Sequence, residues 1–375
     1  MNSLKAKRIA WVMSAAFLMG VAGPAVAQDT IKIAVAGPVT GSVKQYGDMV
    51  IEGVQTAVER INEAGGVNGK KLEVVIYDDA CEPKQAVAVA NKIVSDDVKF
   101  VVGHVCSGST IPAADIYDNE GIVMVTPSAT APVLTEAKLR NSIFRTIGRD
   151  DQQGPIAADY IISKGKWKNV AVLHDKQSYG QGVASVVKTK LEETKVPVVI
   201  FEGINAGESD YSAVITKLKS ANVDFVYYGG YHPELGLLLR QAKEQGLNAV
   251  FMGPEGIANS ALTSIAGPAV EGTLMTLPAD FSASPENAKI VQAFKDKKRD
   301  AAGTFQLPAY SAVVVISDAI AGAKTDDPVK VAEYIHANTF DTPIGKIGFD
   351  EKGDLTNFKF VIFQQSKDGS RAPAP

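Results

Sequence analysis

Short runs of β-branched residues alternate with amphipathic helical stretches along most of this chain. Such alternation predicts parallel sheets with helices packed on both faces. After Gly148 the alternation starts again. A chain of 375 residues is also long for one core, because single cores rarely grow beyond about 250–300 residues. We therefore expect an α/β fold with two lobes, each built on a doubly wound parallel sheet.

The expected elements follow in chain order. The first half should contain strand 31–36, helix 47–64, strand 71–78, helix 83–95, strand 98–105 and strand 122–126. The second should contain strand 169–174, helix 180–194, strand 196–202, helix 211–220, strand 224–229, helix 233–245, strand 249–252 and the segment 272–277. Helices are expected at 284–299, 308–323 and 328–337, then a hairpin of 345–349 with 358–363 and a frayed end over 366–375.

The first residues predict a secretory signal peptide. Three basic residues precede an apolar run over 9–22, and the small residues Ala25 and Ala27 form a cleavage site, so we expect a signal peptide over 1–27. The alternative is a membrane anchor, but the apolar run is shorter than the roughly 18 residues that a spanning helix needs. The mature chain would begin at Gln28.

The charge of the chain argues against anionic partners. The formal net charge is −4, and removal of the basic leader makes it more negative. Neither nucleic acid nor an anionic membrane surface is therefore an expected partner. We also expect no later segment to be apolar enough to span a bilayer, so the exported product should be soluble, without stable membrane insertion.

Cys81 and Cys106 are the only cysteines. In an oxidising compartment we expect them to form a disulfide. Two alternatives stay open. Cys106 could be a nucleophile, since a helix N-terminus lowers the pKa of a thiol and His104 lies close in sequence as a base, or both cysteines could be buried free thiols.

Polar residues follow several of the expected strands, where ligands of parallel sheets bind. Ser107 and Thr130 lie at helix starts, where free N–H groups favour an anion, although such residues are most often helix caps. Glu255 stands in a rigid loop between proline and glycine and could hold an ammonium, although a solvated loop acid is the ordinary alternative. Tyr179 and Tyr231 could wall an apolar side chain, together with Tyr46.

Motifs for catalysis are weak. The glycines of 180–185 follow a strand, but five residues separate that strand from the first glycine, so the tight phosphate turn of a dinucleotide site is missing. The sequence lacks a nucleophile elbow, a P-loop and a zinc-protease motif, and its four histidines are scattered. We therefore expect no enzyme activity, cofactor or metal.

Three blocks resemble the periplasmic leucine/isoleucine/valine-binding proteins of ABC importers: YDDACEPKQAVAVAN at 77–91, DFVYYGGYHPE at 224–234 and FMGPEG at 251–256. The resemblance runs from about residue 31 to 363. It implies the type I periplasmic binding protein fold, with two lobes, a three-segment hinge and the ligand in the interlobe cleft. The implied lobes are 28–148 with 278–355, and 149–277 with 356–375.

The resemblance also implies a ligand set. The ligand carboxylate would meet Ser107 and Thr130 with their nearby N–H groups. The ammonium would meet the Glu255 carboxylate, the Ser128 carbonyl and the Thr130 hydroxyl, with Ala129 between them. The pocket for the ligand side chain would be lined by Tyr46, Val105, Cys106, Tyr179 and Tyr231. Cys81 and Cys106 would form the disulfide of the family. Two positions depart from the family pattern: Gly108, where serine is common, and Ser128, where alanine is common.

The implied function is capture of branched-chain amino acids in the periplasm, by closure of the cleft around leucine, isoleucine or valine. A monomer would then deliver the amino acid to the membrane permease of an ABC importer. Two other functions stay open. One is a secreted amidase or hydrolase that uses Cys106, and the other is a sensory protein that presents its ligand to a receptor.

Overall fold

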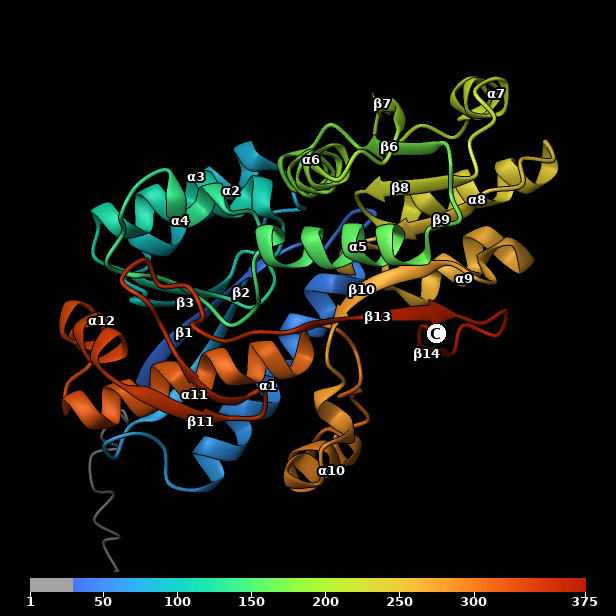
Figure 1. The fold of residues 1–375 in the computed structure, drawn as a ribbon. Coiled ribbons are helices and arrows are strands. Elements are labelled where there is room, and N and C mark those ends of the chain that lie inside the picture. The colour runs from blue at the N-terminus through green and yellow to red at the C-terminus, as the bar shows by residue number, and fades with distance from the viewer. Residues whose placement is uncertain (1–29) are drawn as a thin grey trace, which may run out of the picture.

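The computed structural model describes residues 30–375, which form two α/β lobes (Figure 1). The predicted signal peptide over 1–27 lies outside the described residues.

The first lobe contains a sheet of five parallel strands in the order β2-β1-β3-β4-β5. Its strands are β1 (Thr30–Gly37), β2 (Lys71–Asp78), β3 (Phe100–Gly103), β4 (Val123–Thr126) and β5 (Ile143–Arg145). Its helices are α1 (Lys44–Glu63), α2 (Pro83–Ser95), α3 (Ser107–Asn119), α4 (Val133–Glu136), α10 (Ala288–Asp296), α11 (Gln306–Ala323) and α12 (Pro328–Ala337).

Side chains on β1 alternate between the two faces of this sheet. Ile33 and Val35 belong to the buried cluster that includes α1 and α11, whereas Ala34 and Ala36 belong to the cluster that includes α2 and α3. This alternation is the period-2 pattern of a strand buried on both faces. The expected doubly wound arrangement is therefore present.

The second lobe contains a sheet in the order β14-β13-β10-β9-β8-β6-β7. Its parallel strands are β6 (Val170–His174), β7 (Val198–Gly203), β8 (Phe225–Gly229), β9 (Val250–Gly253) and β10 (Leu274–Pro278). Its helices are α5 (Asp150–Lys164), α6 (Ser178–Glu193), α7 (Ser212–Ser220), α8 (His232–Glu244) and α9 (Ser260–Ala266).

Two expectations for the C-terminal region were wrong. The predicted hairpin of 345–349 with 358–363 does not form, because β12 (Gly345–Gly348) pairs with β11 (Thr339–Thr342), while β13 (Phe360–Gln365) pairs antiparallel with β10 in the second lobe. The end of the chain is not frayed, since β14 (Arg371–Pro373) pairs with β13. A period-2 pattern predicts a strand but does not identify its partner.

Among the described residues the chain crosses between the two sheets three times. The crossings lie between β5 and α5, after β10, and between β12 and β13 (Figure 1). A three-segment connection was expected, and it puts the ends of the strands of both lobes along one cleft.

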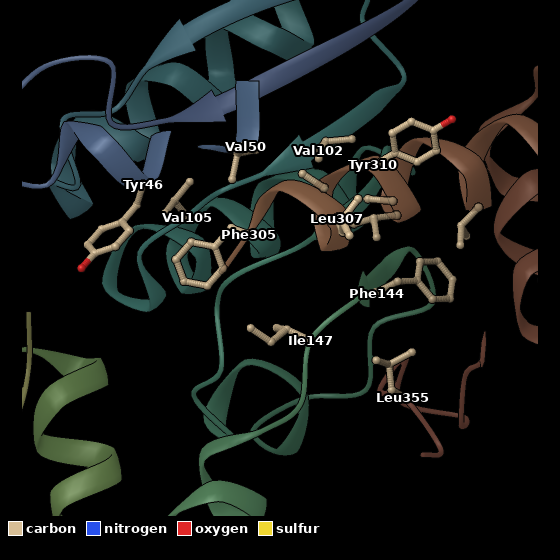
Figure 2. Packing of buried hydrophobic residues seen from close by; sticks show 14 of the residues in the cluster. Tyr46, Val50, Val102, Val105, Phe144, Ile147, Phe305, Leu307, Tyr310 and Leu355 are labelled. Atoms are coloured by element: carbon tan, nitrogen blue, oxygen red, sulfur yellow. The ribbon is translucent and has the colours of Figure 1, made fainter. Parts of the chain in front are cut away.

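The prediction that no later segment is apolar enough to span a bilayer was wrong on composition. Within the described residues, Gln306–Ala323 is long and apolar enough, but 72% of it is buried in the fold. It forms α11, which packs against α1 in the first lobe. The helix is apolar because it is a core helix, and Figure 2 shows Leu307 and Tyr310 of this helix among the buried side chains.

Candidate functional site

The ten predicted site residues all lie near the carboxyl ends of strands, where the two lobes face each other. They follow β1 (Tyr46), β3 (Val105, Cys106, Ser107), β4 (Ser128, Ala129, Thr130), β6 (Tyr179), β8 (Tyr231) and β9 (Glu255). None of these residues is more than 8% exposed. The site is therefore closed to solvent, and its polar groups need partners.

The two loops of the first lobe are joined by side-chain hydrogen bonds. The Ala131 N–H donates to Ser107 Oγ (3.3 Å), and the Ser128 hydroxyl donates to the Val105 carbonyl (2.7 Å). Within residues 30–375 the N–H groups of Ser107 and Thr130 donate to no acceptor, and the Ser128 carbonyl accepts from no donor. The loops after β3 and β4, which we call the rim of the first lobe, therefore carry free backbone N–H donors and a free carbonyl acceptor.

The start of α3 adds to the positive potential of this rim. Ser107 is the first residue of the helix, and the N-terminal N–H groups of a helix lack intrahelical partners and carry partial positive charge. Gly108 follows it and has ample space, because an added Cβ would come no closer than 3.7 Å to Pro83 Cγ. The departure to glycine at 108 therefore widens the rim without distorting it.

Three tyrosines from both lobes form an aromatic wall. The Tyr231 ring lies 5.2 Å from Tyr179 and 6.1 Å from Tyr46, measured between centroids. Tyr46 also contacts Phe305 edge-on at 5.6 Å. Figure 2 shows Tyr46, Val105 and Phe305 together at the end of the core cluster, although they come from three distant segments. The wall offers an apolar surface to a ligand.

Hydrogen bonds from Tyr46 join the two lobes. Its hydroxyl donates to the Gly256 carbonyl (2.7 Å), and it lies 2.9 Å from His232 Nδ1. Because a hydroxyl has one proton and a carbonyl only accepts, His232 Nδ1–H must donate to the Tyr46 oxygen. Burial lowers the pKa of His232 to about 4, so the ring is neutral at pH 7. Tyr179 accepts from the Gly256 N–H at 2.9 Å.

These bonds require glycine at position 256. An added Cβ would lie 2.6 Å from Tyr179 Cε1 and 2.9 Å from the Gly230 carbonyl. Both polar groups of the Gly256 backbone are therefore held by tyrosines of different lobes. Glu255, the preceding residue, is fixed as a result.

Glu255 has an acidic neighbour that the sequence interpretation missed. Asp150 is the first residue of α5, and its N–H donates to the Thr130 carbonyl (2.9 Å). Burial raises the pKa of Asp150 to about 7. Burial and the nearby Asp150 carboxyl raise the pKa of Glu255 to about 8. The pair therefore retains protons near neutral pH.

Gln153 holds Asp150 in place and was also missed. Its Nε2 donates to Asp150 Oδ1 (2.8 Å), and its Oε1 accepts from the Thr276 hydroxyl (2.9 Å). An acid in the first turn of a helix is common for electrostatic reasons alone. Nothing in the local sequence therefore distinguishes Asp150 from an ordinary helix start.

Three of the buried side-chain oxygens that lack a hydrogen-bond partner among the described residues belong to this site: Thr130 Oγ1, Asp150 Oδ2 and Glu255 Oε2. Buried polar atoms in folded proteins are nearly always paired, so such a group marks a place for a polar guest. Backbone N–H donors on the first lobe and carboxyl groups on the second suit a ligand with a negative end and a positive end.

A cavity of about 500 Å³ lies at the mouth of this cleft. Both lobes line it, including Cys81 and Gly108 of the first and Glu234 and Tyr231 of the second. A larger cavity, about 670 Å³, lies elsewhere, around Trp167, and none of the predicted site residues lines it. Cavity size alone therefore does not identify the site.

Cys81 and Cys106 form the expected disulfide, with their Cα atoms 5.6 Å apart, and no free cysteine occurs in residues 30–375. The hydrolase alternative therefore lacks its thiol. His104 cannot serve as its base either, because its buried ring contacts Asp79 Oδ2 at 2.6 Å and the Tyr117 hydroxyl at 2.9 Å. In the described part of the chain, no group of three or more His, Cys, Asp or Glu residues could hold a metal.

Known proteins are similar to this chain over nearly its whole length. Residues 30–370 match a family described as periplasmic binding protein. A leucine-, isoleucine-, valine-, threonine-, and alanine-binding protein of Pseudomonas aeruginosa is 58% identical over 365 residues, covering 97% of this chain and 98% of that protein. A Leu/Ile/Val-binding protein of Escherichia coli K12 is 50% identical over 350 residues, covering 93% and 94%.

Solved structures are similar over nearly the whole fold. A leucine-binding protein of Thermotoga maritima has a TM-score of 0.85 at 30% identity, covering 92% of this chain and 98% of that chain. A branched-chain amino acid transporter substrate-binding protein of Streptococcus pneumoniae, in complex with isoleucine, has a TM-score of 0.82 at 26% identity, covering 92% and 99%.

Proposed function

The chain belongs to the periplasmic binding protein family, and on that premise we propose that it captures leucine, isoleucine and valine for an ABC importer. The observation that carries this proposal is the meeting of free N–H groups from one lobe with unpaired acid oxygens from the other. An enclosed zwitterion must have both of its charges paired, because an unpaired buried charge is too costly. The relatives named above support the same ligand class.

The carboxylate of the amino acid would bind to the first lobe. The N–H groups of Ser107 and Thr130 are free to donate to it. Ser107 Oγ already accepts from the Ala131 N–H, so its own proton is available for the carboxylate. Hydrogen bonds to a charged acceptor are about twice as strong as neutral ones. This arrangement supports selection for a free carboxylate.

The ammonium would bind between the lobes. The unpaired oxygens of Glu255 and Thr130 and the free Ser128 carbonyl supply three acceptors for three N–H protons. Asp150 adds a second carboxyl beside Glu255, which would become negatively charged when the ammonium binds. Ser128 takes part through its backbone, since its hydroxyl is used by Val105, and Ala129 contributes the peptide that links these groups.

The apolar side chain would pack against Tyr46, Tyr179, Tyr231, Val105 and the Cys106 disulfide. Burial of a leucine-sized side chain contributes roughly 1.5–3 kcal/mol. This contribution favours leucine over alanine, whereas the charged groups impose the requirement for an α-amino acid.

The permease would recognise the closed form of the protein, in which the ligand is bound. The acids lie on the second lobe and the carboxylate donors on the first, so only a shut cleft satisfies both ends of the ligand. The hinge would comprise the crossings near 148/149, 277/278 and 355/356, which divide the lobes as 28–148 with 278–355 and 149–277 with 356–375. We propose that the protein acts as a monomer in the periplasm after cleavage following Ala27.

Calorimetric titration with the common amino acids tests this function. Leucine, isoleucine and valine should bind most tightly, alanine and threonine more weakly, and leucine without its amino group should not bind. Binding of none of the amino acids would reject the proposal.

A further inference from the structure

Arg145, the last residue of β5, is completely buried and sits behind the loop that would hold the carboxylate. One terminal nitrogen donates to the Ala129 carbonyl (3.0 Å) and the Ala131 carbonyl (3.3 Å). The other donates to the Thr135 hydroxyl (2.7 Å). Its Nε lies 2.5 Å from Asp354 Oδ1. The guanidinium thus contacts two loop carbonyls, a hydroxyl and a carboxylate.

The two carbonyls held by Arg145 flank Thr130 in the chain. In a trans peptide the C=O and the next N–H point in opposite directions. The Ala129 carbonyl points toward Arg145, so the Thr130 N–H points away from it, toward the open side of the loop. Within residues 30–375 that N–H has no acceptor. A cation at the carbonyl polarises the peptide and makes its N–H a stronger donor.

Asp354 keeps Arg145 from moving. Its Oδ2 accepts from the Thr135 hydroxyl (2.8 Å) and contacts Arg149 at 2.6 Å. Asp354 belongs to the crossing between β12 and β13, and its chain neighbour Leu355 lies in the same buried cluster as Phe144 (Figure 2). The buried ion pair of Arg145 and Asp354 therefore joins the end of β5, behind the binding loop, to the crossing between β12 and β13.

We propose that Arg145 is a positioning residue for the amino-acid carboxylate. It aims the Thr130 N–H at the ligand and strengthens it, although Arg145 itself contacts no ligand group. This inference rests on the proposed function. It assigns selectivity for a charged carboxylate partly to a residue behind the site.

The test compares leucine with leucinamide, which lacks the negative charge at that end, by calorimetry and competition. Arg145→Lys keeps the charge but loses the planar fork that reaches two carbonyls, Thr135 and Asp354 together. We expect leucine to bind at least tenfold more weakly and leucinamide less than threefold more weakly. Arg149→Lys is the matched control, because Arg149 contacts the same Asp354 and no loop carbonyl, and it should leave the ratio of the two affinities unchanged.

A second variant covers the case in which Arg145→Lys does not fold. Thr135→Val keeps the guanidinium and removes one of its acceptors. It should therefore lower the ratio of leucine affinity to leucinamide affinity, as Arg145→Lys does, but by a smaller factor. Equal losses for leucine and leucinamide in the folded variants would overturn the inference and leave the proposed function standing. If the wild-type protein binds no amino acid, the proposed function fails and the inference fails with it.

Discussion

At the scale of single residues, Glu255 shows how burial prepares a carboxyl for a cation. The raised pKa means that the side chain is largely neutral in the empty site at pH 7. Glutamine is therefore a close mimic of the empty state and a poor partner for an ammonium. The empty site favours the protonated form of this carboxyl, whereas the site with bound ammonium favours its ionised form.

Glu255→Gln should weaken leucine binding by roughly 3 kcal/mol, about a hundredfold, because loss of one partner of a buried charge pair costs about this much. The melting temperature of the ligand-free protein should change little. Calorimetry measures the first effect, and the exposed acid Glu271 provides the control variant Glu271→Gln. Less than tenfold weakening would remove Glu255 from the site.

Tyr179 has two separable contributions, its ring and its hydroxyl. Tyr179→Phe keeps the wall but leaves the buried Gly256 N–H unpaired, so it should weaken leucine and alanine by similar factors. Tyr179→Ala should weaken leucine more than alanine, by up to roughly tenfold, because the larger side chain loses more burial. Titration of both ligands into both variants checks this, and equal losses in Tyr179→Ala would place the ring outside the side-chain pocket.

The predictability of the site differs from residue to residue. The rule for the ends of parallel strands singled out Ser107, Thr130, Glu255 and the three tyrosines. The remaining site residues, Val105, Cys106, Ser128 and Ala129, came from the family resemblance. Asp150 and Gln153 escaped because they begin a helix after a chain crossing, and their position beside Glu255 depends on how the lobes are joined. The His232 ring contacts Tyr46 across the cleft, and the sequence does not reveal this contact because it too depends on how the lobes are joined.

At the scale of elements, local sequence patterns predicted where helices and strands lie along the chain better than which strands pair with each other. The predicted bounds of β2 and α2 match the structure. The predicted hairpin failed because β13 pairs with β10, far away in the sequence and in the other lobe. The apolar composition of α11 was also misjudged, since the burial that explains it comes from tertiary packing.

The disulfide belongs to this scale, because it joins the loop after β2 to the start of α3. It spans 25 residues, and closing a loop of that length stabilises the fold by about 3.5 kcal/mol in the chain-entropy model. The double variant Cys81→Ser with Cys106→Ser should lose about that much free energy of unfolding in a urea titration. Wild-type protein under reducing conditions is the control and should lose the same amount, and an unchanged urea midpoint in both would contradict the assigned stabilisation.

At the scale of the whole molecule, ligand binding should be linked to proton release. The empty site retains protons on Asp150 and Glu255 up to about pH 7–8, whereas ammonium binding requires ionised carboxylates. The empty form therefore binds more protons than the complex, so affinity for leucine should rise with pH between 5.5 and 8, by up to about tenfold per unit for each proton released.

The same linkage has the opposite sign for folding of the empty protein. Both carboxyls have pKa values above those of the unfolded chain, so they contribute less stability as pH rises from about 4 to 8. Stabilisation by leucine should thus grow with pH. Calorimetry in buffers of different ionisation enthalpy counts the protons released. Glu255→Gln should reduce the pH dependence, because only Asp150 can then release a proton, and equal affinity of the wild-type protein at pH 5.5 and 8 would contradict this linkage.

The central claim is that opposite ends of one amino acid are held by opposite lobes. A crystal structure of the protein with leucine tests it most directly. We expect the carboxylate within hydrogen-bond distance of the Ser107 and Thr130 N–H groups, and the ammonium within the same distance of Glu255. Leucine bound to one lobe alone, or outside the cleft, would contradict the account.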